Sequence, residues 1–104
     1  MAKRIELSAQ ALVLRRIESL IRTQLSEGTP VSLRSCYFSE TPRSESLAYI
    51  FFSFPNGQGI PGQLTHKPGI PRASLVPEKA LPIAQWIVRQ IRVIRPEWFI
   101  EQSA

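Results

Sequence analysis

The stretch Leu47-Ala-Tyr-Ile-Phe-Phe-Ser-Phe54 is almost continuously apolar and rich in aromatic residues. Aromatic and β-branched side chains favour strands, and a strand this apolar is typical of the middle of a sheet. The preceding segment, residues 31–39, alternates in polarity with the period of two that indicates another strand. Residues 40–46 between them read Glu-Thr-Pro-Arg-Ser-Glu-Ser, a composition typical of a turn. We therefore expect segments 31–39 and 47–54 to form a β-hairpin.

A helix is predicted on either side of this hairpin. Apolar residues recur at helical spacing through residues 8–27, where Ser8 is a suitable N-cap and Gly28 a suitable left-handed C-cap. The same spacing recurs over residues 83–94. Pro96 ends this second helix, because the residue before a proline is pushed out of the α region. We expect the apolar residues after Pro96 to dock on the rest of the domain.

Residues 55–72 differ in composition from the rest of the chain. They hold most of the five glycines and many of the nine prolines. Glycine tolerates positive φ and proline fixes φ, so we expect a long irregular loop. This loop either binds a partner or is a surface connection without a binding role. Part of this segment could instead be an irregular edge strand. Residues 73–76 are expected to add a short strand.

Together these elements predict one α+β domain over residues 1–104. The sheet is expected to be small and antiparallel, with two to four strands. Two helices pack on one of its faces, in the order helix, strand, strand, loop or strand, helix. A chain of 104 residues is long enough to bury a real core in this arrangement.

The residue inventory excludes several kinds of catalytic and metal site. The chain has one His, one Cys and no Asp, whereas structural zinc uses about four Cys or His ligands and calcium sites rely on Asp. No metal and no cofactor is therefore expected. The segment 57–62 matches the dinucleotide-binding pattern G-x-G-x-x-G, but no helix can begin after it, so we interpret it as a by-product of a glycine-rich loop. A Cys36–His66 pair is the remaining route to catalysis, and we expect a protein that is not an enzyme.

Cysteine usage and hydropathy bear on the compartment. A lone Cys cannot form an internal disulfide, which indicates a reducing environment. Arg15, Arg16 and Glu18 interrupt the apolar N-terminal stretch, so it does not resemble a secretory signal. No apolar run is long enough to span a bilayer. We therefore expect a cytoplasmic protein with no membrane partner.

The chain is basic, with 13 Lys and Arg against 8 acidic residues and a net charge of +5. Arginine predominates, and its planar guanidinium binds phosphate and stacks on bases. Our leading hypothesis is a small accessory protein that binds nucleic acid through an arginine-rich surface. The alternative is a regulator or inhibitor that engages an acidic protein through the 55–72 loop or a sheet edge. The candidate contact residues for either partner are Arg15, Arg16, Arg22, His66, Lys67, Arg72, Arg89, Arg92 and Arg95.

The aromatic residues allow a more specific expectation. Tyr37, Tyr49 and Phe51 would share one face of the hairpin if the register allows it, and such a face can stack on bases. Trp86 and Trp98 are expected to be core residues or interface anchors. A small sheet also leaves an edge strand and apolar surface to cover. A homodimer would cover both, so a second copy of the chain is a further candidate partner.

Overall fold

The computed structural model describes residues 2–38, 47–55 and 61–100, and the side chains of these ranges apart from residues 2–8 and 36–38. It has the α+β architecture expected from the sequence, in which one helix precedes the strands along the chain and the other follows them. Three short 3₁₀ turns, η1 to η3, connect or follow these elements. The elements are α1 (Ala2–Arg22), β1 (Ser32–Phe38), β2 (Leu47–Pro55), β3 (Pro61–Thr65), β4 (Ile70–Pro71), η1 (Arg72–Ser74), η2 (Pro77–Lys79), α2 (Ala80–Ile94) and η3 (Pro96–Trp98).

Strand β2 lies at the centre of the antiparallel sheet, as its apolar sequence predicts. It pairs with β1 on one side, with Arg34 opposite Phe51. On its other side the start of β2 pairs with β4, so that Ala48 lies opposite Ile70, and the later part of β2 pairs with β3, so that Phe52 lies opposite Leu64. The expected hairpin of segments 31–39 and 47–54 is therefore confirmed.

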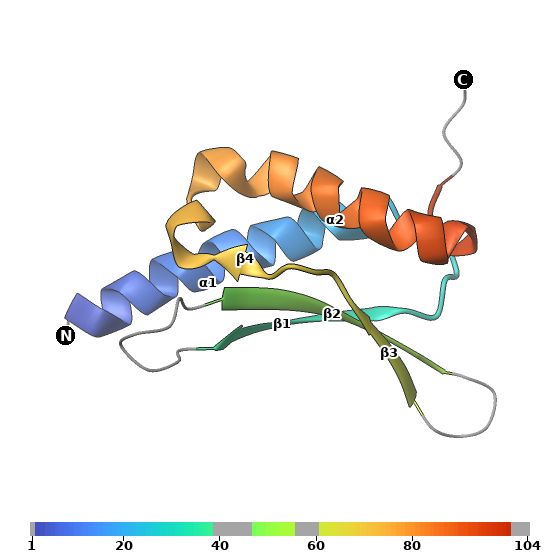
Figure 1. The fold of residues 1–104 in the computed structure, drawn as a ribbon, viewed down its shortest axis with the longest axis horizontal. Helices are drawn as coiled ribbons and strands as arrows, with labels where there is room; N and C mark the ends of the chain where they lie inside the picture. Colours follow the sequence, from blue (N-terminus) through green and yellow to red (C-terminus); the bar gives the residue numbers. More distant parts are fainter. Residues whose placement is uncertain (1, 39–46, 56–60, 101–104) are drawn as a thin grey trace.

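Both helices lie over the same face of the sheet, side by side, and no described element covers the other face (Figure 1). Strand β2 shows this asymmetry directly, because its even-numbered residues Ala48, Ile50 and Phe52 are buried while Tyr49 and Phe51 are half-exposed. Alternation of this kind is typical of a sheet with one covered face.

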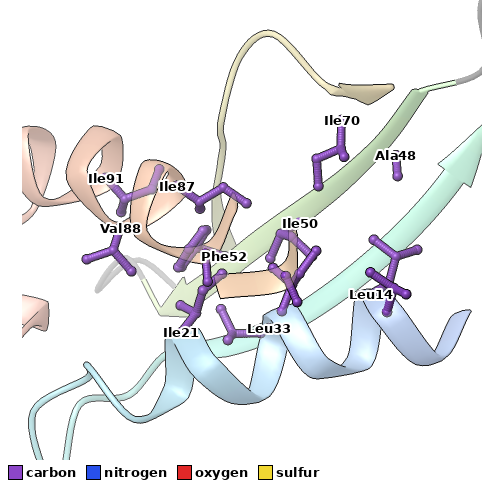
Figure 2. Close-up of a cluster of buried hydrophobic side chains, with 14 of the residues drawn as sticks. Leu14, Ile21, Leu33, Ala48, Ile50, Phe52, Ile70, Ile87, Val88 and Ile91 are labelled. Carbon is purple, nitrogen blue, oxygen red and sulfur yellow. The ribbon is translucent and has the colours of Figure 1, made fainter. Parts of the chain in front are cut away.

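The core fills the space between the helix layer and the sheet (Figure 2). Its side chains come from both helices and from the strands, and each fully buried aliphatic or aromatic side chain contributes about 1.5–3 kcal/mol. The largest fully buried apolar side chains are those of Ile17 and Ile21 of α1, Ile50 and Phe52 of β2, Ile70 of β4, and Ile87 and Ile91 of α2. The hydroxyl of Ser35 adds a polar link between the layers by donating to the Glu18 carboxylate at 3.4 Å.

The first helix differs from its expected bounds. It begins at Ala2 and not after an N-cap at Ser8, because the residues before Ser8 include good helix formers that extend it. It ends at Arg22 rather than at residue 27, where turn bonds such as Leu25 N–H to the Arg22 carbonyl at 3.1 Å redirect the chain. Gly28 does adopt the left-handed conformation, with a φ of 83°, in the turn that leads to β1.

The segment from 55 to 76 is more regular than its composition suggests. The irregular-loop interpretation is wrong for β3 and β4, and the edge-strand alternative is correct, because β2 offers its free edge as a template for both short strands. The expected strand at 73–76 does not form, since η1 turns the chain towards α2. The predicted turn at 40–46, and residues 57–60 of the G-x-G-x-x-G match, lie outside the described residues.

The C-terminal residues dock as expected. Arg95 leaves the α region at φ −133° and ψ 70°, which ends α2 just before Pro96. The chain then runs back along the segment after α1, where Leu25 and Phe99 form an antiparallel bridge. The backbone N–H of Ser26 donates to the Trp98 carbonyl at 2.8 Å. Burial of Trp98 shows that this residue is a core anchor.

Candidate functional site

The uncovered side of the sheet presents a surface that we call the open face. Its described residues are Ser32 and Arg34 of β1, Leu47, Tyr49, Phe51 and Ser53 of β2, and Gln63 and Thr65 of β3, all placed on one side by the strand register. None of these residues is acidic. The open face is therefore aromatic at its centre, polar at its rim and positive where it is charged.

Two aromatic rings and one guanidinium form the centre of the open face. The ring centroids of Tyr49 and Phe51 lie 6.3 Å apart. Arg34 is exposed and lies directly opposite Phe51 in the register. No described carboxylate pairs with Arg34. Flat rings beside an exposed guanidinium can stack on planar ligands and attract their negative charge.

The ring of Tyr49 has close neighbours in the segment between β3 and β4. It lies over Gly69, where an added Cβ would come within 2.7 Å of the Tyr49 ring. On its inner side it contacts the His66 ring, with centroids 5.7 Å apart. A glycine is required at position 69 because β2 and the segment before β4 approach so closely.

The register corrects one part of the aromatic prediction. Tyr49 and Phe51 share the open face as expected, but Tyr37 pairs with Ala48 rather than with Tyr49. Residues directly opposite each other in an antiparallel pair belong to the same face of the sheet. Position 37 therefore belongs in register with the helix-covered face, since Ala48 is buried there. The sequence alone could not show which residues of the two strands lie opposite each other, because the residues between the strands do not determine the pairing register.

His66 is buried within the fold and is not part of a surface. Its Nε2 accepts the backbone N–H of Ile50 at 3.0 Å, and its Nδ1 lies 3.2 Å from the Pro68 carbonyl oxygen, which assigns the proton to Nδ1. Its ring also meets the Trp86 ring edge-on at 5.4 Å. Burial lowers the pKa of His66 below its ordinary value. Both nitrogens are thus committed to internal hydrogen bonds, and the base that a Cys36–His66 pair would need is occupied.

Lys67 lies beside His66 and is fixed through its backbone. The side-chain amide of Gln90 on α2 accepts the Lys67 N–H at 3.1 Å and donates to the Lys67 carbonyl at 2.8 Å. The ammonium-bearing side chain of Lys67 remains exposed. Arg72 is also exposed, in η1.

The remaining predicted contact residues lie on the helix layer, not on the open face. Arg15, Arg16 and Arg22 are exposed on α1, and Arg89 is exposed on α2. The sequence therefore located basic residues correctly on solvent-facing helix positions, but the fold does not gather all of them with the aromatic rings. Arg34, which the sequence reasoning did not single out, is the basic residue that joins those rings.

Arg92 and Arg95 are partly engaged within the protein. The guanidinium of Arg92 lies over the Phe99 ring at 5.4 Å. That of Arg95 lies 5.1 Å from the Phe54 ring centroid and 3.7 Å from the Glu97 carboxylate. Such cation–π contacts hold a guanidinium in a fixed position. These two arginines therefore help to pack the end of α2 against the sheet and the C-terminal residues.

Among the residues that the structure describes, no three His, Cys, Asp or Glu side chains come together as a metal site would require. Within the same residues, neither helix has the length and apolar character needed to cross a bilayer. Comparison of the chain with protein-family models, with curated proteins and with solved structures finds no significant match.

Proposed function

We propose that this protein binds single-stranded nucleic acid on the open face of its sheet, as an accessory protein without catalytic activity. The observation that supports this proposal is the adjacent pair of half-exposed rings, Tyr49 and Phe51, with Arg34 exposed opposite Phe51 and not paired with any described carboxylate. Single strands expose the faces of their bases, and aromatic side chains on a sheet can receive them by stacking. A duplex hides those faces inside its own stack.

Charge supports the same class of partner. Arg34 offers a guanidinium to a phosphate or a base, and no described residue of the open face carries a negative charge that would repel a nucleic acid. The net charge of +5 also favours encounter with a polyanion. Ser32, Ser53 and Gln63 at the rim supply hydrogen-bonding groups without a fixed base preference, so we expect little sequence specificity.

The test is fluorescence anisotropy with a labelled single-stranded oligonucleotide and its duplex, titrated at about 50 and 200 mM salt. We expect the single strand to bind more tightly than the duplex, with affinity that falls as salt rises. Phe51→Thr keeps a strand-forming residue and should weaken binding by about 1–3 kcal/mol, the usual contribution of one stacked base. Arg34→Gln should weaken binding and lower the salt dependence.

Arg16→Gln is the matched control, because it makes the same charge change on the opposite side of the molecule. Circular dichroism of each variant establishes that the fold is retained. Absence of binding at low salt overturns the proposal, as does an equal loss in Arg34→Gln and Arg16→Gln. In that case the alternative partner, an acidic protein at the sheet edge or the 55–72 segment, becomes the next one to test.

A further inference from the structure

A groove of about 560 Å³ runs between α1 and α2. Its lining includes Leu20 and Gln24 of α1, and residues of α2 between Leu81 and Arg92. The core-facing residues Ile87 and Ile91 are not in the lining, so the groove opens on the outer surface of the helix layer. Its volume falls in the range of about 300–1,000 Å³ that is typical of small-molecule sites.

Polarity changes along this groove. On α2 the lining begins at Leu81 and Ala84, continues through Gln85 and Val88, and ends at Arg89 and Arg92. The distance from Leu81 to Arg92 along the helix is ~16 Å at 1.5 Å per residue. Leu81 is 53% exposed, a large apolar side chain left without a covering layer. An occupant that matches this gradient is apolar along most of its length and charged at one end.

The sign of that charge follows from the two arginines. Among the residues that the structure describes, no acidic side chain lines the groove and no carboxylate pairs with Arg89. Arg92 is held over the Phe99 ring, so its guanidinium is already positioned, and its Nη2 has no hydrogen-bond acceptor among the described residues. A carboxylate is the planar, bidentate acceptor that best satisfies such groups.

We propose that the groove between α1 and α2 binds a free aliphatic carboxylate, with its chain over Leu81 and Val88 and its carboxylate at Arg89 and Arg92. This site is separate from the open face and does not depend on the proposed nucleic-acid binding. It would give the protein a second ligand of a different chemical class.

Decanoate is the probe for the test, titrated into the isotope-labelled full chain and followed by the backbone amide signals in NMR spectra. We expect saturable shifts confined to residues 20–24 and 81–92. Decyltrimethylammonium has the same chain and the opposite charge, and should bind at least tenfold more weakly. Each methylene removed from the carboxylate should weaken binding by up to about fourfold, since a buried methylene is worth about that factor.

Variants of exposed arginines separate the site from general charge. Arg89→Gln removes one cation from the groove and should weaken decanoate binding at least fivefold, whereas Arg15→Gln, on α1 outside the lining, should leave it unchanged. Arg92→Lys keeps the charge but loses the bidentate geometry, and should fall between the two. The proposal is overturned if shifts map to the open face, if both amphiphiles bind equally, or if Arg89→Gln and Arg15→Gln behave alike.

Discussion

His66 completes the hydrogen bonding of the central strand. Strand β2 is paired with β3 from Phe51 onwards and with β4 up to Ala48, so Ile50 falls where neither strand continues the ladder. The imidazole Nε2 of His66 accepts the Ile50 N–H in place of a backbone carbonyl. A buried N–H left without an acceptor costs about 1–3 kcal/mol. The His66 side chain therefore supplies the hydrogen-bond acceptor that a neighbouring strand would otherwise provide for Ile50.

This role makes stability depend on pH. Burial lowers the pKa of folded His66 below its ordinary value of 6.5, while the unfolded chain keeps that ordinary value. Below about pH 6.5 the unfolded state takes up a proton that the folded state resists, so stability is full above this pH and falls as the pH drops towards the folded pKa. We expect the melting temperature to decrease from pH 8 to pH 5.5.

The control for this prediction is His66→Gln, which retains an acceptor for the Ile50 N–H and does not titrate. Because the chain has one His, the variant removes the only side chain that ordinarily titrates in this window. Thermal unfolding followed by circular dichroism should therefore show a much flatter pH profile for the variant. Parallel profiles for the two proteins would contradict the assignment of His66.

Gly69 shows what a residue type alone conceals. The sequence marks this position as a place where regular structure breaks, and the structure gives a different reason for the glycine, namely the Tyr49 ring where a Cβ would lie. That contact joins residues of two separate elements, and so it depends on the strand pairing. His66 is similar, because neither its burial nor its partner Ile50 follows from its neighbours in sequence.

At the scale of elements, one side chain attaches the segment between β3 and β4 to α2. The Gln90 amide pairs with both backbone groups of Lys67, at 3.1 and 2.8 Å. It satisfies that backbone much as a neighbouring strand would. This pairing attaches the segment around His66 to α2.

We expect Gln90→Ala to destabilise the fold by about 1–2 kcal/mol, since two hydrogen bonds are lost at a partly exposed site. The effect should be local: the substitution should speed up hydrogen exchange of the Lys67 amide more than exchange of the amides in the middle of β2. Gln85→Ala is the control, because Gln85 is an exposed residue of the same helix that makes no hydrogen bond to the residues the structure describes. Equal exchange rates for Lys67 in both variants would exclude this role for Gln90.

The elements with a strong local pattern were predictable from the sequence, and those that depend on a partner were not. The periodicities around Ile17, Ile50 and Ile87 gave the two helices and the central hairpin, because each repeats within a few residues. Strands β3 and β4 were only an alternative, since their glycines and prolines disfavour strands and the free edge of β2 stabilises them. The open face depended further on the register, which placed Arg34 beside Phe51 and moved position 37 to the other side.

At the scale of the whole molecule, the fold separates two kinds of surface. The helices and the sheet form two layers (Figure 1). The helix layer carries most of the described arginines and the groove between α1 and α2, while the open face carries the aromatic pair. Composition could show that the chain is basic, but the direction in which each basic residue points is a property of the packed layers. The two proposed sites lie on opposite sides of the core, so substitutions in one should leave binding at the other unchanged.

The two tryptophans report on different parts of this core and allow its unity to be tested. Trp98 packs against Phe54 at 5.0 Å and its backbone carbonyl receives the Ser26 N–H, so it reports on the docked C-terminal residues. Trp86 contacts His66 at the other side of α2. If the chain forms one cooperative domain, Trp86→Phe and Trp98→Phe should each show a single urea transition, with the fluorescence of the remaining tryptophan coinciding with circular dichroism at 222 nm. An earlier fluorescence transition when Trp98 is the sole reporter would mean that the C-terminal residues detach first, and that the layers do not unfold as one unit.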